Sequence, residues 1–368
     1  MVETQIIRAL HARLTAVAGF YHLPIEALEE MDAKGLAHDH LRVKGTGWLL
    51  RVPKQSQFGF SASENLTYQA ACFGRVGASG QAPRLRSVFE PGPDLPMGAL
   101  LVEEINGMAP ILPRDLPLLA EAMARVHALP LPPPAERPPL EDHSDPVAGI
   151  LKEIESQARY LKPAGLDPRA EAAIEGELDW ARSFAAAVRR RTSPQPVTLV
   201  LTDTHPGNFL ITSSKAVIVD LEKALYGAPG IDLAHATVYS STTWDSATYA
   251  VLTLAEIAGF YRAYLTQVAA LKSMDFAVQL EPWLIPMRRL LLLRALTWCA
   301  LWRVEHKKAA TSDKTSAAET RDWSADNTDA TVIDHVRDRV DHYLSGDTVT
   351  MMQSEWLESP TLEGLIDL

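Results

Sequence analysis

The chain has 368 residues, of which 47% are hydrophobic and 22% charged, so it is long enough for two lobes or domains and too apolar for a disordered protein. Its net charge of −11 argues against nucleic-acid binding, which needs a basic surface. The two cysteines, Cys72 and Cys299, lie in apolar neighbourhoods and predict buried reduced thiols. No apolar run is long enough for a bilayer, and the N-terminus lacks a signal-peptide pattern, so we expect a soluble cytoplasmic protein without membrane contacts.

The first 107 residues predict a small mixed lobe with a leading helix. Apolar residues at helical spacing indicate that helix over residues 1 to about 30. The segment "DHLRVKGTGWLLRVPK", residues 39–54, predicts two strands joined by a glycine turn. A helix with Ser63 as N-cap is expected next, and "GALLVEEI", residues 98–105, predicts another strand. We assign residues 1–107 to this lobe.

Residues 108–368 predict a larger, mainly helical lobe. Helical patterns cover residues 115–129, 145–190, 246–272, 286–307 and 331–344. The strand-like runs "VTLVL", "NFLI" and "AVIVD" lie between the second and third of these helices. Residues 307–331 are polar and rich in helix breakers, which predicts a loop. The fold class is therefore α+β, with two unequal lobes.

A polar loop interrupts the apolar runs of the large lobe, in "VTLVLTDTHPGNFLI". Asp203 and Asn208 lie in this loop, and Asp220 ends the next apolar strand. Phosphoryl transfer from ATP needs a carboxylate that orients the acceptor hydroxyl and oxygen ligands that hold Mg²⁺. An Asp and an Asn at this spacing, followed by a strand and an Asp, provide that set. The alternative is an ordinary polar turn, because Asp, Asn, Pro and Gly all favour turns.

The stretch "TDTHPGNFLI", followed by "AVIVDLEKALYGAPGIDLA", resembles the aminoglycoside phosphotransferase and choline kinase superfamily. The resemblance implies a two-lobed protein-kinase-like fold that transfers the γ-phosphate of ATP to a hydroxyl of a small molecule. It implies Asp203 as the catalytic base, and Asn208 and Asp220 as Mg²⁺ ligands. Asp232, in "PGIDLA", would support the lobe rather than take part in the chemistry.

The same resemblance implies where the nucleotide binds. Arg51, in "LLRVP", takes the position of the basic residue that grips the α- and β-phosphates of ATP, where Lys is commoner. The hinge that would bind adenine through its backbone consists of Glu103, Glu104 and Ile105. ATP and Mg²⁺ are thus the expected cofactors.

Three departures from the family pattern keep an alternative open. Leu201 replaces the customary His two residues before the base. Gln69 aligns with the helix residue that should pair with Arg51, which leaves Glu64 as the other candidate. The phosphates would be covered by "AKGLAHDH", residues 33–40, which lacks the usual glycines. The alternative is a catalytically inactive nucleotide-binding protein of the same fold.

The sequence indicates only the chemical class of the molecule that accepts the phosphate. The segment between Asp220 and Asp232 is short, which disfavours a protein acceptor and favours a small molecule. The acidic composition slightly favours a cationic acceptor. Trp244, Trp298 and Trp302 invite an aromatic cage, but Trp298 and Trp302 stand four apart in an apolar helix, which is typical of core packing. The oligomeric state and the acceptor itself stay open.

Four further side chains near the predicted site have two interpretations each. Glu222 and Lys223 follow the strand that ends at Asp220, and they either join the site or remain solvated. His205 and His235 lack the spacing of a zinc site, so we expect them to shape the loop through hydrogen bonds.

Overall fold

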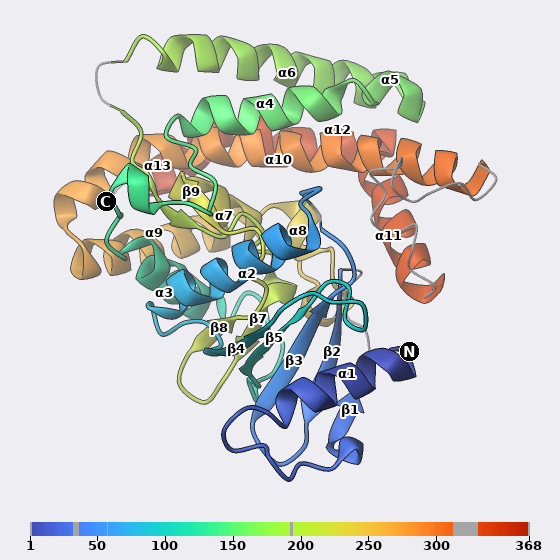
Figure 1. Ribbon diagram of the computed structural model, residues 1–368. Coiled ribbons are helices and arrows are strands. Elements are labelled where there is room, and N and C mark those ends of the chain that lie inside the picture. The colour runs from blue at the N-terminus through green and yellow to red at the C-terminus, as the bar shows by residue number, and fades with distance from the viewer. Residues whose placement is uncertain (1, 32–36, 57, 192–193, 312–329, 367–368) are drawn as a thin grey trace.

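The structure is a computed structural model that describes residues 2–31, 37–56, 58–191, 194–311 and 330–366. A small lobe built on a β-sheet lies against a larger helical lobe (Figure 1). This is the α+β architecture that the sequence predicts. No helix of the described residues is long and apolar enough to cross a membrane.

The small lobe contains a five-stranded antiparallel sheet in the order β1-β2-β3-β5-β4. Its strands are β1 (Leu28–Glu30), β2 (His38–Val43), β3 (Trp48–Pro53), β4 (Leu85–Phe89) and β5 (Ala99–Glu103). Gly45 and Gly47, between β2 and β3, have φ angles of 73° and 72°, which only glycine adopts without strain. The predicted hairpin is thus confirmed, whereas β1 and β4 were not predicted.

Two helices cover opposite faces of this sheet, α1 (Thr4–Leu14) and α2 (Ala62–Gly77). Leu10 of α1 packs in one cluster with Leu101 of β5. Phe73 of α2 packs in another with Leu100. Neighbouring residues of a strand point to opposite faces, so β5 contributes to both cores.

The predicted starts and ends of these helices need correction. The N-cap of α2 is Ser61, whose side chain and that of Glu64 each accept a hydrogen bond from the other's backbone N–H. Ser63 lies inside the helix, because Leu66 three residues later cannot complete such a capping box. The helix expected over residues 1–30 ends at Leu14, and Gly19, with φ of 93°, lies in the turns before the 3₁₀ helix η1 (Ile25–Ala27).

Helices make up most of the large lobe. They are α3 (Leu116–His127), α4 (Pro146–Ala158), α5 (Leu161–Ala164), α6 (Pro168–Val188), α7 (Pro229–His235), α8 (Tyr239–Thr242), α9 (Leu254–Leu271), α10 (Met274–Thr311), α11 (Ala330–Tyr343), α12 (Gly346–Leu357) and α13 (Ser359–Ile366), with the 3₁₀ helices η2 (Pro134–Glu136) and η4 (Ser246–Thr248). The long α10 contacts α4, α7 and α9, and it lies beneath α4 and α6 in Figure 1. The lobe is therefore organised around α10.

Three helix predictions in this lobe are only partly right. The helix expected over 145–190 is divided into α4, α5 and α6, with Gly165 in the left-handed conformation between the last two. The helix expected over 286–307 is the middle of α10, which continues through Pro282 and Pro286. Residues 246–248 form η4 before α9 begins. The loop predicted over 307–331 begins inside α10, and its residues 312–329 lie outside the described part of the chain.

Two short antiparallel strand pairs carry the polar loop. Strand β6 (Thr198–Val200) pairs antiparallel with β9 (Leu225–Gly227), and β7 (Phe209–Ile211) pairs antiparallel with β8 (Ala216–Ile218). The 3₁₀ helix η3 (Pro206–Asn208) directly precedes β7. The strands therefore place the segment after β6 and the segment after β8 close to each other.

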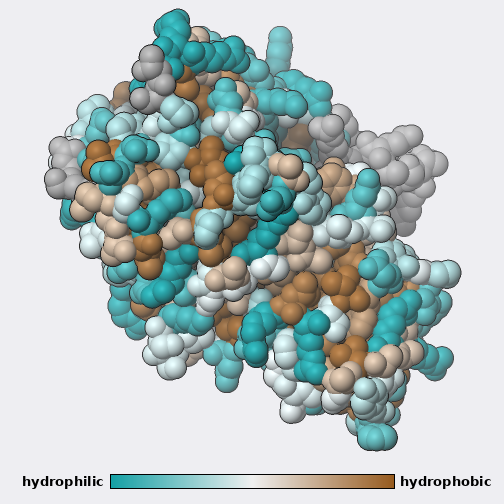
Figure 2. Space-filling model, turned by 60° about the vertical axis from the view of Figure 1, so that its left-hand side comes forward, coloured by the Kyte–Doolittle hydropathy of each residue, from teal (hydrophilic) through white to brown (hydrophobic). Residues whose placement is uncertain are grey.

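One hydrophobic core extends through both lobes. It joins Phe73 of α2 to Met123 of α3, Phe209 of β7 and Tyr261 of α9. A second cluster lies between α4, α6 and α10–α12. Both cysteines are buried, as predicted, and burial raises the pKa of the Cys299 thiol to about 12. On the face in Figure 2, hydrophobic residues form scattered patches among hydrophilic ones.

Candidate active site

Asp203 lies between β6 and η3 in a loop held by hydrogen bonds. The Asn208 side-chain amide donates to the Asp203 carbonyl oxygen at 2.8 Å, and the Asn208 N–H donates to the His205 carbonyl oxygen at 2.9 Å. The backbone N–H of Thr204, the residue after Asp203, donates to Nδ1 of His235 at 3.0 Å. His235 thus shapes the loop as expected, whereas Nδ1 of His205 is buried without a hydrogen-bond partner among the described residues.

The residue before Asp203 has an unusual backbone conformation. Thr202 has a φ of 60°, and a β-branched residue pays roughly 1–2 kcal/mol for it. Its N–H donates to Asp232 at 2.7 Å, its hydroxyl donates to the Lys223 carbonyl oxygen at 3.0 Å, and its own carbonyl oxygen accepts from Arg294 at 2.9 Å. Such over-determined strain is found at functional sites, and no sequence pattern predicted it.

Asp232 is completely buried beneath the loop. Its carboxylate accepts from the amides of Leu201 and Thr202, at 2.8 Å and 2.7 Å, and lies 3.0 Å from Nε2 of His127. These contacts fix the chain just before Asp203, in agreement with the supporting role expected of Asp232. The side chain of Leu201, where a His was expected, is buried in the core.

Lys223 forms an ion pair with Asp203, with 2.6 Å between Nζ and Oδ2. Burial alone would raise the pKa of Asp203, but the charge of Lys223, with His235 and His205, outweighs burial and lowers the pKa. Burial alone would lower the pKa of Lys223, but Asp203 and Glu222 raise it. Of the two interpretations of Lys223, the structure therefore supports a place in the site.

Asp220 follows β8 and lies beside Asn208, because the Val219 N–H donates to the Asn208 carbonyl oxygen at 3.0 Å. Arg51 reaches it from β3 of the other lobe, with 2.5 Å between its guanidinium and Oδ1 of Asp220. The structure thus brings the predicted Arg51, Asn208 and Asp220 together. Asp203 joins them through its backbone contact with Asn208.

Arg51 belongs to a buried group of polar side chains that also contains His38, Gln69 and Glu222. The Arg51 guanidinium lies 3.2 Å from Nδ1 of His38, and Nε2 of His38 lies 3.1 Å from Glu222. Gln69 donates to Glu222 at 3.2 Å. Burial and the neighbouring Asp220 raise the pKa of Glu222 to about 7, whereas burial and Arg51 lower the pKa of His38 well below its usual value.

Neither predicted partner of Arg51 bonds to it within the residues that the structure describes. Gln69 bonds to His38 and Glu222 instead. Glu64 is exposed and caps its own helix. Sequence reasoning missed His38, whose position in a strand beside Arg51 was its one available signal.

The predicted hinge follows β5 and is partly committed to the sheet. The Glu103 N–H donates to the Arg84 carbonyl oxygen, and the Glu104 N–H donates to the Gly47 carbonyl oxygen, both at 2.9 Å. The amide of Ile105 makes no backbone hydrogen bond to any described residue. Of the predicted phosphate cover, residues 33–36 lie outside the described residues, and residues 38–40 form the start of β2.

Trp244 and Trp298 of the large lobe pack on other aromatic rings. Trp244 lies edge-on to Trp298, with ring centroids 5.9 Å apart, and stacks on Tyr343 at 6.3 Å. Trp302 is buried in the same cluster. The arrangement agrees with core packing rather than with an open cage.

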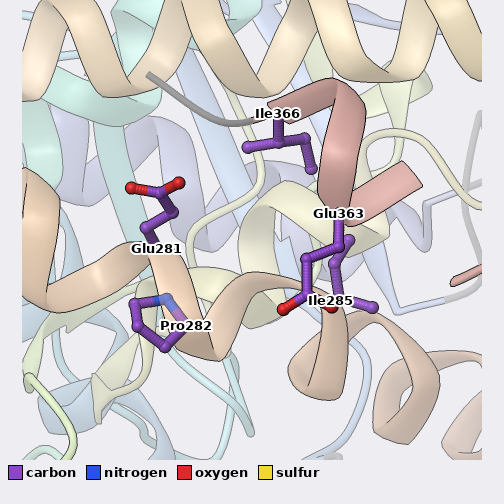
Figure 3. Close-up of a pocket in the computed structure, with 5 residues that line it drawn as sticks. All are labelled: Glu281, Pro282, Ile285, Glu363 and Ile366. Carbon is purple, nitrogen blue, oxygen red and sulfur yellow. The ribbon is translucent and has the colours of Figure 1, made fainter. Parts of the chain in front are cut away.

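A pocket with a volume of about 120 Å³ lies between α10 and α13 (Figure 3). Its lining residues are Glu281, Pro282, Ile285, Glu363 and Ile366. It shares no residue with the site around Asp203, and it is well below the roughly 300 Å³ at which small-molecule sites begin. It therefore adds nothing to the functional argument.

A sequence model described as "Phosphotransferase enzyme family" matches residues 32–276, two thirds of the 368 residues. The chain therefore belongs to the phosphotransferase enzyme family. No curated protein sequence matches it.

Several solved structures share the fold. A choline kinase from Cryptosporidium parvum is 15% identical, with a TM-score of 0.58 over 97% of this chain and 98% of the other. An ethanolamine kinase from Plasmodium vivax is 13% identical, with a TM-score of 0.56 over 95% and 89%. A choline/ethanolamine kinase family protein from Mesorhizobium loti is 17% identical, with a TM-score of 0.50 over 91% and 99%. At these identities they establish the fold, which confirms the predicted two-lobed kinase-like architecture.

Proposed function

We propose that this protein transfers the γ-phosphate of ATP to a hydroxyl group of a small molecule. One observation carries the proposal: Arg51 of the small lobe meets Asp220 of the large lobe at 2.5 Å, beside Asn208 and the loop of Asp203. A phosphate-binding cation, two oxygen ligands for a metal and a carboxylate for the acceptor are thus within one site. This is the set that phosphoryl transfer requires.

Each residue has a role in this proposal. Asp203 orients the acceptor hydroxyl and takes its proton, and Lys223 keeps Asp203 ionised. Asn208 and Asp220 would hold Mg²⁺. Arg51 would bind phosphate oxygens, and the hinge Glu103, Glu104 and Ile105 would bind adenine.

The donor atoms of the site fit magnesium and phosphate. Asn208 uses its amide nitrogen on Asp203, which leaves its side-chain oxygen as a hard ligand beside the Asp220 carboxylate. No group of three or more His, Cys, Asp or Glu side chains in the described ranges could hold a metal alone. Mg²⁺ commonly takes one or two carboxylates and completes its shell with substrate phosphates. Nε of Arg51 is buried without a partner in the described chain, which suits a phosphate oxygen.

The chain's contribution to catalysis is positioning and charge. ATP and Mg²⁺, when bound, supply the transferred group and neutralise its oxygens. The hydrogen bonds of Asp232 and Arg294 around Thr202 hold the Asp203 loop in one conformation before substrate arrives. Preorganised groups of this kind lower the barrier because they need no rearrangement during the reaction.

The structures named as choline and ethanolamine kinases make amino alcohols the first acceptors to test. The net negative charge of the chain does not indicate the charge of the acceptor, because two cations lie at the site itself. Lys223 lies beside Asp203, and Arg294 contacts Thr202. Amino sugars and neutral sugars therefore belong in the same screen.

The test is calorimetric titration of ATP, with and without Mg²⁺, into wild-type protein and Asp220→Ala. An ADP-release screen over amino alcohols, amino sugars and simple sugars follows. We expect Mg²⁺-dependent binding that Asp220→Ala abolishes, and release stimulated by one acceptor class. Binding that ignores Mg²⁺, without release, would support the inactive alternative, and no binding at all would refute both.

A further inference from the structure

A buried group of four polar side chains connects the two lobes behind Asp220. The inference drawn from this group rests on the proposed function. His38 of β2, Arg51 of β3 and Gln69 of α2 come from the small lobe, whereas Glu222 follows β8 in the large lobe. Each of the four is no more than 5% exposed. Polar groups so deeply buried need hydrogen-bond partners, and buried charges need counter-charges.

The contacts fix the direction of the hydrogen bonds. The Arg51 guanidinium can only donate, so Nδ1 of His38, at 3.2 Å, must accept. Nε2 of His38 then carries the ring proton and donates it to Gln69 Oε1 at 3.3 Å, and Glu222 lies 3.1 Å from the same nitrogen. Gln69 donates its amide to the same oxygen of Glu222 at 3.2 Å. His38, Gln69 and Arg51 therefore all lie against Glu222.

The balance of charges also points to Glu222 as the partner of Arg51. Arg51 is buried, and Gln69, the residue that helix α2 contributes to this group, is neutral. The nearest carboxylate is Asp220, at 2.5 Å from the guanidinium, and Glu222 is next at 3.8 Å. When Asp220 ligates Mg²⁺, its charge is shared with the metal, and Glu222 is the carboxylate that remains for Arg51.

We propose that Glu222 is the positioning residue of the phosphate-binding Arg51, which it holds directly by charge and indirectly through His38. The carboxylate that fixes this cation thus comes from the large lobe, while helix α2 contributes only the neutral Gln69. Because the group spans both lobes, it also fixes the position of the Arg51 side chain relative to Asp220.

A carboxylate swap tests this proposal. Glu222→Gln keeps the size and the acceptor oxygen of the side chain but removes its charge. We expect it to weaken ADP binding about tenfold in calorimetry without Mg²⁺, because Asp220 is then the remaining carboxylate beside Arg51 and competes with the phosphates for it, and to raise the KM for ATP but not that for the acceptor. The double variant Gln69→Glu with Glu222→Gln returns one carboxylate to the group, and we expect ADP affinity within about threefold of wild type.

The outcomes separate this role from others. A metal-ligand role would leave Mg²⁺-free ADP binding unchanged in Glu222→Gln, and the double variant would not recover activity. If Glu222 merely repelled phosphate, Glu222→Gln would bind ADP more tightly. Either result overturns the proposal. Glu64→Gln, the same change at the exposed start of α2, is the matched control and should leave ADP affinity unchanged.

A measurement on the wild-type protein does not depend on the folding of variants. Nitrogen-15 NMR of the His38 ring should show the neutral tautomer protonated at Nε2. A ring protonated at Nδ1 would break the chain between Arg51 and Glu222 and overturn the proposal. If wild-type protein bound no ADP, the proposed function would fail with it. If wild type and Glu222→Gln bound ADP equally, only the role of Glu222 would fail.

Discussion

The two aspartates of the site differ in where their cations come from. Asp203 pairs with Lys223, and both belong to the large lobe. Asp220 pairs with Arg51, which belongs to the small lobe. The first pair lies within one lobe, so it persists however the lobes are placed. The second exists only while the lobes are in register.

This difference separates two tasks. The pair within the large lobe prepares the end of the site where we place the acceptor, and it rests on the buried Asp232. The pair between lobes lies where we place the nucleotide, and it is backed by the buried group around Glu222. Variants at the first pair should therefore change turnover, and variants at the second should change nucleotide affinity.

The largest expected effect is on turnover. Asp203→Asn removes the proposed base, and positioned general bases typically contribute about 10²- to 10⁴-fold, so kcat should fall by that factor. ADP affinity should stay within about twofold of wild type, because the pair between lobes is intact. Steady-state kinetics and calorimetry measure the two quantities. A comparable loss of ADP affinity would show that the two pairs are not independent.

The next largest effect is on stability. Asp232→Ala leaves the buried amides of Leu201 and Thr202 and the ring of His127 without their acceptor. Breaking a buried charged network costs about 3–5 kcal/mol, and we expect that loss in urea unfolding. Asp179→Ala, an exposed aspartate of α6, should change the free energy of unfolding by no more than about 0.5 kcal/mol. Equal effects of both variants would contradict the role of Asp232.

Much of the catalytic loop could be predicted from sequence because its signals are local. Asp203, Asn208 and Asp220 lie within eighteen residues of one another, between short strands with clear apolar patterns. The hairpin that carries Arg51 was equally local, since its glycines require positive φ. These segments form largely from their own turn chemistry and pattern.

The partners of these residues could not be predicted, because they depend on contacts between distant segments. His38 and Glu222 are 184 positions apart, and Arg294 reaches Thr202 across 92 positions. The short strands β1 and β4 were missed for a related reason: apolar and polar residues do not alternate regularly in Leu28–Glu30 and Leu85–Phe89, and pairing with neighbouring strands makes these segments strands. The identity of the counter-charge of Arg51 is thus a property of the folded chain.

A smaller effect concerns pH. Lys223 keeps the pKa of Asp203 low, so Asp203 stays ionised, and its pair adds stability above the unfolded pKa that is lost as the pH falls. In Lys223→Gln, the largest charge that opposes burial is removed and the pKa of Asp203 rises. The acid limb of kcat/KM should move to higher pH than in the wild-type protein. An acid limb at the wild-type position would mean that Lys223 does not control Asp203.

The smallest effect tests how helix α2 is anchored. Ser61→Ala removes one half of its capping box, which should cost about 1 kcal/mol of unfolding free energy. Thr253→Ala removes the same feature from α9 of the large lobe and should cost a similar amount. Neither should alter ADP affinity, because Gln69 is held by His38 and Glu222 rather than by the start of its helix. If Ser61→Ala alone weakened ADP binding, then Glu64 would support Arg51 through α2, and the pair between lobes would depend on the small lobe more than on Glu222.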